Sequence, residues 1–427
     1  MYILSSSLLT RHDQTITHAH SQWFRVATAP PGTQAAQFDI DAAYRRIATV
    51  FNHWKFLVVS LPNHKTGLPE YFIDMAHPFG LKSAGGNLGY AMDATIAILQ
   101  HSLLIPFIAK WVDDLVTLRY PSRTKDDHFE YDVTFDEICS VFHTLGWPLS
   151  TDKIRDFSPR VRYIGFDWDF PSRTVILPEE KRLKFLNRLS IWTQAASSHS
   201  GVSAYDTEKL IGSLNHISNI FPHARSALPS LHAFLASFRS DSRFVTIRAS
   251  HAAIADARLW HELLSIPNAF RHLEIRAHIN LDIWVDASTD WGIALIVGKS
   301  WRAWKLRPGW KANRRDIGWA ESAAIEIATL YIASLRVRHK SFLIHSDNQG
   351  SIGQYEKGRS RNVESNLCIR RATVVMMQGA FDIAPAYVPS ADNRADAASR
   401  GLNLLEATRL RSRFAIPSEL AIWLNEA

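Results

Sequence analysis

The residues of this chain that are best suited to chemistry are acids at the ends of apolar segments. Asp113 and Asp114 lie side by side between two such segments, residues 105–112 and 115–118. Aspartate is disfavoured inside strands, and an unpaired carboxylate is costly to bury or takes up a proton. A hairpin turn accommodates such a pair, although it lacks the glycine typical of a tight two-residue turn. The sharper interpretation is a divalent metal site at the tip of a hairpin.

A second acidic strand lies closer to the N-terminus, in FDIDAAY. Strand alternation places Asp39 and Asp41 on the face opposite the two apolar side chains. If this strand neighbours the hairpin, Asp39 and Asp113 converge. Carboxylate oxygens are ligands that Mg²⁺ prefers, together with waters and substrate phosphates. Two such ions about 4 Å apart would clamp an in-line phosphoryl displacement.

Four acids in the C-terminal third repeat the pattern. Asp286 ends the alternating strand LDIWVDAS, Asp347 ends SFLIHSD, and Asp396 lies near a helix start in NRADAASRG. The segment between the first two is expected to contain a long helix. Glu321 lies on the small apolar face of that helix, whereas Glu326 lies off it and is expected in solvent. A turn, a cap or a helix dipole would explain each acid singly.

The elements that must position these acids fall into two modules. Strands and helices are mixed over residues 38–177, the segment 178–264 is mostly helical, and strands alternate with helices again from residue 280. The natural division is therefore two α/β (α+β) modules joined by a helical segment.

Composition narrows the classes of protein to which the chain can belong. Its 427 residues suffice for two or three domains, and 46% hydrophobic residues indicate a globular chain. A net charge of +7 is compatible with nucleic acid as a partner. Two distant cysteines exclude a disulfide framework and a cysteine-based zinc site, which suits the nucleus or the cytoplasm. We expect neither a signal peptide nor a membrane-spanning run of about 20 apolar residues.

The N-terminal motifs together resemble the palm of reverse transcriptases. FDIDAAY, HPFGLKSAG, WVDD, LGWPLSTDK and YIGF follow one another in that family's order. The resemblance implies that Asp39 and Asp113 are metal ligands, with Asp114 as the accompanying acid of the same catalytic site. The resemblance covers residues 38–183.

The same resemblance implies substrate-binding roles for four further residues. Tyr44 falls where the family senses the nucleotide sugar, and Phe79 and Gly80 fall in the loop against template and incoming nucleotide. Lys153 belongs to the later LG…K motif, and the segment 163–166 resembles the primer grip.

The chain departs from the reverse-transcriptase pattern at two places. Trp111 replaces the tyrosine of the YxDD-type box. Only 37 residues precede Phe38, fewer than the family's fingers region usually has. We therefore expect truncated fingers and a weakened grip on the nucleotide.

The four C-terminal acids resemble the catalytic set of ribonuclease H. The order is an aspartate at a strand end, a glutamate on the next helix, an aspartate at a later strand end and an aspartate near the last helix. These are Asp286, Glu321, Asp347 and Asp396. The run VPSADNRADAASR resembles the closing motif of retrotransposon ribonuclease H domains, although it lacks the histidine of retroviral and bacterial relatives. The resemblance implies two metals that activate a water and cut the RNA strand of a hybrid.

These resemblances together predict a domain organisation. The predicted segments are 1–37, a remnant of the fingers; 38–185, a palm of ferredoxin-like type; 186–278, a helical thumb or connection; 279–405, a ribonuclease H-like mixed-sheet domain; and 406–427, a C-terminal tail. The order is most similar to eukaryotic retrotransposon polyproteins, with a DIRS-like tyrosine-recombinase element first and a long-terminal-repeat element second.

The implied function is reverse transcription with ribonuclease H activity. Each active site would use two Mg²⁺, with Mn²⁺ as a second candidate. The partners would be an RNA template, a DNA primer, an RNA–DNA hybrid and deoxynucleoside triphosphates. The alternative is a decayed or truncated element-derived protein that binds nucleic acid without polymerising, with or without nuclease activity.

Two other features have competing interpretations. The run WRAWKLRPGWKANRR, residues 301–315, is either a hybrid-binding ridge of aromatic and basic residues or an ordinary hairpin with a solvated basic turn. His345 shares a strand face with Asp347, where a packed core histidine is the ordinary explanation.

Overall fold

The described part of the chain divides into two compact units. The structure is a computed structural model that describes residues 26–125, 128–198, 200–239, 243–267, 269–273, 277–402, 404–412 and 414–427. The first unit comprises residues 1–178 with 270–275, and the second comprises 179–269 with 276–427. Residues 1–25 of the expected fingers remnant lie outside the described residues. The predicted domain boundaries stay predictions.

The first unit is built on an antiparallel sheet in the order β4-β5-β1-β8. Two helices accompany it. The elements in chain order are β1 (Gln34–Asp39), α2 (Ala84–Ser102), β4 (Phe107–Trp111), β5 (Asp114–Arg119), α3 (Phe135–Thr144) and β8 (Arg155–Ser158). This βαββαβ order with two outer strands beside a central pair is the ferredoxin-like arrangement expected for the palm.

The sheet and its two helices share one apolar core. Phe38 of β1 and Leu115 of β5 are fully buried against Leu88 and Met92 of α2 and Phe142 of α3. The buried positions of α2 recur at intervals of three and four residues, as a helix packed on a sheet requires. α3 begins at a capping box in which Thr134 and Glu137 bond each other's backbone N–H groups.

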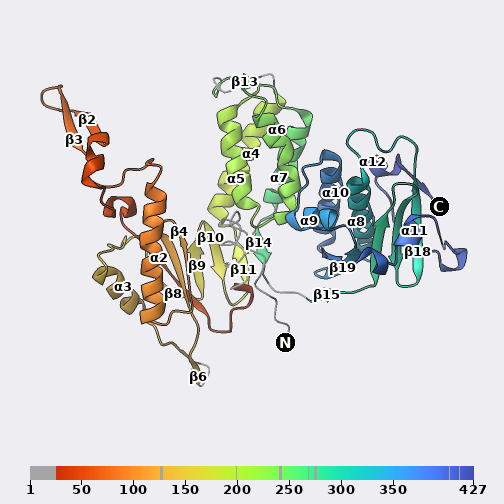
Figure 1. Ribbon diagram of the computed structural model, residues 1–427, viewed down its shortest axis with the longest axis horizontal. Helices are drawn as coiled ribbons and strands as arrows, with labels where there is room; N and C mark the ends of the chain where they lie inside the picture. The colour runs from red at the N-terminus through yellow and green to blue at the C-terminus, as the bar shows by residue number, and fades with distance from the viewer. Residues whose placement is uncertain are drawn as a thin grey trace. The chain divides into compact units, whose positions relative to one another are not determined.

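Smaller strands complete the first unit. A second sheet has the order β14-β11-β10-β9, and two separate ribbons pair β2 with β3 and β6 with β7. Figure 1 shows the β2–β3 ribbon extending away from the β1 sheet. The bounds are β2 (Val58–Pro62), β3 (Pro69–Ile73), β6 (Arg123–Lys125), β7 (His128–Glu130), β9 (Arg160–Tyr163), β10 (Phe166–Asp169), β11 (Thr174–Ile176), β14 (Phe270–His272) and the 3₁₀ helices η1 (Ala43–Arg46) and η2 (Phe51–Phe56).

The second unit begins with a helical bundle, as the sequence predicts for this region. Its helices pack through buried side chains that include Trp192, Leu210 and Trp260. The elements are α4 (Glu179–Ser197), β12 (Val202–Ser203), α5 (Ala204–Ile217), η3 (Pro222–Ala227), α6 (Pro229–Leu235), β13 (Thr246–Ile247) and α7 (His251–Ser265).

The rest of the second unit is a mixed sheet covered by helices. β16, β17 and β18 are antiparallel neighbours, while β19 runs parallel to β16 and β20 parallel to β19. The strands are β15 (His278–Ile279), β16 (Ile283–Ala287), β17 (Gly292–Val297), β18 (Ser300–Leu306), β19 (Ser341–Ser346), β20 (Asp382–Tyr387) and β21 (Leu424–Glu426). The helices are α8 (Ile317–Ser334), α9 (Gln349–Lys357), α10 (Val363–Gly379), η4 (Ser390–Asp392), α11 (Asp396–Ser399), η5 (Glu406–Thr408) and α12 (Ser418–Ala421). The sheet combines parallel and antiparallel pairs, so the predicted α/β class with mixed sheets is confirmed.

α8 is the central helix of this unit, and it corrects one prediction. Glu326, expected in solvent, is fully buried and forms an ion pair with Arg371 of α10. The reason is that α8 is covered twice, by the sheet on one side and by α10 on another (Figure 1). A prediction from one apolar face therefore misses the residues of α8 that α10 buries.

The segment 406–427 takes part in the same sheet. β21 pairs antiparallel with the outer edge of β18, and Leu424 lies in the core. Among the described residues, no helix is both long enough and apolar enough to cross a membrane.

Candidate metal centres

The first centre lies where β1 meets the β4–β5 hairpin. β1 and β5 are antiparallel, and their register places Asp39 directly opposite Asp114. Asp113 lies in the turn before Asp114, after Val112, whose φ of 61° is strained for a β-branched residue. The structure thus places Asp39 beside the acidic pair, as expected from the strand pattern.

Lys153 lies against the same acids. Its Nζ is 3.0 and 3.1 Å from the two carboxylate oxygens of Asp39, which is 4% exposed. Burial raises the pKa of Asp114 to about 6, and the charges of Asp39 and Asp113 add to the shift. Crowded carboxylates of this kind are stabilised by added positive charge, which Lys153 supplies in part.

Two of the predicted substrate-binding residues are in contact. The rings of Tyr44, in η1, and Phe79 have their centroids 5.0 Å apart. Gly80 has a φ of 93°, a conformation that favours glycine, and the preceding Phe79 is 80% exposed. The segment 163–166 forms the turn between β9 and β10.

The second centre gathers three of the four predicted C-terminal acids. Asp286, Glu321 and Asp347 each offer a carboxylate oxygen, and these oxygens all lie within 4.8 Å of one another. Within the described ranges, no other group of three or more histidine, cysteine, aspartate or glutamate residues is arranged to hold a metal.

The topology explains why these acids meet. β16 and β19 are parallel neighbours, so Asp286 near the end of β16 and Asp347 just after β19 lie at the same edge of the sheet. α8 packs on β16 with Glu321 in its second turn. A strand end, a helix start and a second strand end thereby converge.

The electrostatics of the second centre favour a cation. Burial, with the charges of Asp286 and Asp347, raises the pKa of Glu321 to about 9. Burial also raises the pKa of Asp286 to about 7, against an opposing hydrogen bond from Ser399. Glu321 is 4% exposed, and its Oε2 has no hydrogen-bond partner among the residues that the structure describes. An all-carboxylate donor set with an unsatisfied buried oxygen fits Mg²⁺ or Mn²⁺.

Asp396 is placed differently from the other three acids. It begins α11, and its carboxylate forms an ion pair with Arg400 at 2.8 Å, one turn along the helix. Its charge still acts on Asp286. The structure therefore brings three predicted ligands together and holds the fourth at the rim.

Three polar residues around the carboxylates were missed by the sequence reasoning. Asn393 Nδ2 donates to Asp286 Oδ1 at 3.3 Å and to Asp347 Oδ1 at 3.2 Å. Ser390 donates to Asp347, and Ser399 donates to Asp286. All three lie in SADNRADAAS. Serine and asparagine are also common helix caps, so the residue types alone do not show that these three belong to the site.

The structure also shows the surroundings of residues 301–315 and of His345. Trp310 and Arg315 are both buried, with Trp310 against Trp319 and Arg315 over the Trp423 ring. Residues 301–306 belong to β18, and the loop after them leads into α8 instead of turning back as a hairpin. Lys311 and Arg314 of this loop are exposed, whereas Trp310 and Arg315 are packed inside the protein. His345 is half-buried and stacks on Trp284.

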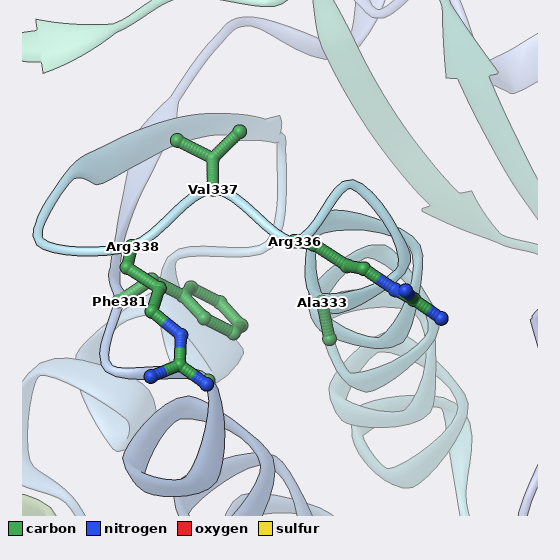
Figure 2. A pocket seen from close by; sticks show the side chains of 6 residues that line it. Ala333, Arg336, Val337, Arg338 and Phe381 are labelled. Carbon is green, nitrogen blue, oxygen red and sulfur yellow. The ribbon is translucent and has the colours of Figure 1, made fainter.

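A pocket at the far end of α8 is separate from the second centre. Figure 2 shows Ala333, Arg336, Val337, Arg338 and Phe381 around a cavity of about 440 Å³. Ala333 is twelve residues after Glu321 on α8, which places the two about 18 Å apart along the helix axis. No acid of the described part of the chain lines this cavity, so it is no candidate for a metal centre.

The raised pKa of Glu321 predicts a pH-dependent stability. Because the folded pKa, about 9, lies above the unfolded value near 4.5, the contribution of Glu321 to stability is fully present below pH 4.5 and is lost as the pH rises to 9. Glu321→Gln, which carries no charge, is expected to raise the free energy of unfolding of the metal-free chain at pH 8 by about 2–4 kcal/mol. Denaturation in EDTA at pH 5 and pH 8 measures this. Glu356→Gln, an exposed control on α9, should show the same change in stability between pH 5 and pH 8 as the wild type. If Glu321→Gln also showed the wild-type change, the buried Glu321 would not be its cause.

Two of the solved structures that are similar to this chain hold a viral enzyme. A foamy viral protease–reverse transcriptase in complex with double-stranded DNA is 10% identical, with 90% of this chain and 60% of that chain covered and a TM-score of 0.43. A foamy viral protease–reverse transcriptase in complex with an RNA/DNA hybrid is 10% identical, with 92% of this chain and 48% of that chain covered and a TM-score of 0.45. The chain thus matches less than two thirds of either. Scans against family models and curated proteins gave no match.

Proposed function

We propose that this chain is a reverse transcriptase with ribonuclease H activity. The observation that carries the proposal is the group formed by Asp286, Glu321 and Asp347, whose oxygens lie within 4.8 Å of one another. The pairing of Asp39 with Asp114 supports a second centre in a separate unit. Two acidic centres, on a ferredoxin-like sheet and a ribonuclease H-like sheet, fit polymerisation and hybrid cleavage.

At the second centre, Asp286, Glu321, Asp347 and Asp396 would hold the two metals. When bound, the ions would generate an attacking hydroxide from water and stabilise charge on the phosphate. Asn393 holds two of the carboxylates in place through its amide N–H group. The hybrid would be selected by its A-like shape and 2′-hydroxyls, not by its sequence.

At the first centre, Asp39, Asp113 and Asp114 would hold the metals that serve the primer 3′-hydroxyl and the triphosphate. Tyr44, whose ring contacts that of Phe79, would bind the nucleotide and template together with Phe79 and Gly80. Lys153 would have to leave Asp39 when metal binds, because its Nζ engages both oxygens of that carboxylate. A lysine beside a phosphate site is suited to the departing pyrophosphate.

A second function is favoured by one specific observation. Among the described residues, only the second centre has three ligand atoms grouped for a metal, whereas Lys153 engages Asp39 at the first. This difference favours a chain that cuts hybrids but polymerises poorly. Such a chain would stand between a fully active enzyme and a decayed protein that only binds nucleic acid.

The proposed partners follow from the two activities. They are an RNA template, a DNA primer, an RNA–DNA hybrid and deoxynucleoside triphosphates, in the nucleus or cytoplasm. A retrotransposon origin, DIRS-like before long-terminal-repeat, rests on the motifs of the sequence.

Primer extension and hybrid cleavage by the wild-type chain test the proposal. With Mg²⁺, we expect extension of a DNA primer on an RNA template and cleavage of the RNA strand of a labelled hybrid, both stopped by EDTA. Cleavage without extension would select the second function. If a chain shown to be folded had neither activity, both enzymatic proposals would be refuted.

A further inference from the structure

A rigid aromatic and charged cluster lies beside the second centre. Asp282 accepts hydrogen bonds from Trp284 Nε1 at 2.7 Å and from Arg394 at 2.7 Å. The Arg394 guanidinium also lies over the indole, 4.9 Å from the ring centroid. Asp282 itself adopts a left-handed φ of 57°, a conformation that costs energy and is held here by its neighbours. We call this group, with His345, the Trp284 platform.

His345 supports the platform from the neighbouring strand. Its ring is stacked on Trp284, with centroids 4.2 Å apart and planes inclined by 16°. Because the carbonyl of Ile283 can only accept, His345 Nδ1 is the donor of the 3.0 Å hydrogen bond between them. Two rings and one guanidinium are therefore held in fixed orientations before any ligand arrives.

The platform lies on the same face of the sheet as Asp286 and Asp347. Trp284 and Asp286 are two residues apart on β16, and His345 and Asp347 are two residues apart along β19, so each pair projects to one side. Trp284 and His345 are register partners. The platform is thus one pleat, about 7 Å, from the acids.

Arg394 has the donors that a phosphate requires. Its side chain is 56% exposed, and among the described residues only its Nη1 makes a hydrogen bond. Nε and Nη2 remain to donate as a planar fork, the geometry that suits phosphate oxygens. An exposed ion pair with Asp282 contributes little to stability, but it does fix the orientation of that fork.

We propose that Arg394 binds a backbone phosphate of the nucleic acid adjacent to the one cleaved at the second centre. This inference rests on the proposed ribonuclease H function and assigns that site a substrate-binding residue. Asp282, Trp284 and His345 are positioning residues that hold the guanidinium. The contact is to the backbone, so it carries no preference for sequence.

Arg394→Gln in the full chain tests the inference. We expect the KM for hybrid cleavage to rise about tenfold, the loss of one charge-assisted phosphate contact, with kcat unchanged. The slope of log affinity for the hybrid against log salt should become shallower by about one. Arg394→Lys keeps the charge but not the planar pair of donors, so its KM and salt slope should lie between those of the wild type and those of Arg394→Gln. Arg361→Gln, an equal loss of charge at an exposed position between α9 and α10, should match the wild type.

Two further measurements separate this role from other causes. Fluorescence anisotropy with a labelled hybrid in Ca²⁺ reports binding without cleavage, so it decides on Arg394 even if the wild-type chain cuts nothing. Equal hybrid affinity of wild type and Arg394→Gln would overturn the inference. Titration with Mn²⁺ reports the metal centre, and a loss of Mn²⁺ affinity in Arg394→Gln would also overturn it, because Arg394 would then act by holding Asn393 and Asp396.

Discussion

Asp347→Asn is expected to abolish cleavage of an RNA–DNA hybrid while primer extension continues at the wild-type rate, and Asp113→Asn is expected to do the reverse. Each substitution removes a charged oxygen from a different acidic cluster and preserves the size of the side chain. The loss should exceed the 10–100-fold typical of changes around a metal's ligands, because a ligand itself is removed. The two activities should separate because Asp113 and Asp347 belong to different compact units, each with its own core.

Both assays are run on both variants, alongside thermal unfolding to establish that the chain is folded. Asp41→Asn is the matched control for the first centre, because Asp41 is exposed and pairs with Arg46 only two residues from Asp39. Asp392→Asn serves the second centre, one residue from Asn393 and exposed. If either test variant lost both activities without unfolding, the proposal of two independent centres would be wrong.

The parts of these centres that sequence could predict are the strand ends. Alternation with period two assigns Asp39 and Asp286 to defined faces of their strands, and an acid that ends an apolar run is conspicuous. Neighbouring strands then bring such acids together through register alone, as with Asp39 and Asp114. Local pattern carries this information because the side-chain period of a strand is a property of the backbone.

Burial on α8 could not be predicted in the same way. A helical face is visible in sequence only when a single partner covers it, and α8 has the sheet on one side and α10 on another. Glu321 and Glu326 lie five positions apart, about 140° around the helix, yet both are buried. The partner of Glu326, Arg371, lies 45 residues away on a different helix, and nothing local indicates that the two will meet.

The polar surroundings of the carboxylates were equally beyond the local pattern. Asn393 reaches β16 across 107 residues of chain, and Arg394 reaches Asp282 across 112. Their neighbours in sequence suggested a loop with a helix cap, which describes the backbone correctly and says nothing of what the side chains bind. Lys153 is a similar case, since its contact with Asp39 depends on where β8 meets β1.

The ion pair between Glu326 and Arg371 predicts a large effect on stability. Glu326 is fully buried, and its two oxygens accept from Arg371 Nε and Nη2 at 2.6 and 2.8 Å. Burial raises the pKa of Glu326, and the hydrogen bonds from Arg371 oppose that shift. Arg371→Met would leave the carboxylate buried without its partner, so we expect the free energy of unfolding at pH 8 to fall by about 3–5 kcal/mol.

The double variant Glu326→Leu/Arg371→Met separates the value of the pair from the cost of a lone charge. Removing both charges leaves nothing unsatisfied, so we expect it to recover most of the loss seen in Arg371→Met. Urea denaturation of the full chain measures both variants, and Mn²⁺ titration adds a second readout. Because Glu326 fastens α8 to α10 and α8 carries Glu321, Arg371→Met should weaken Mn²⁺ binding and the double variant should restore it. If the double variant were as unstable as Arg371→Met, the ion pair would be a true source of stability, and α8 would owe its position at the second centre to that pair more than to its apolar packing.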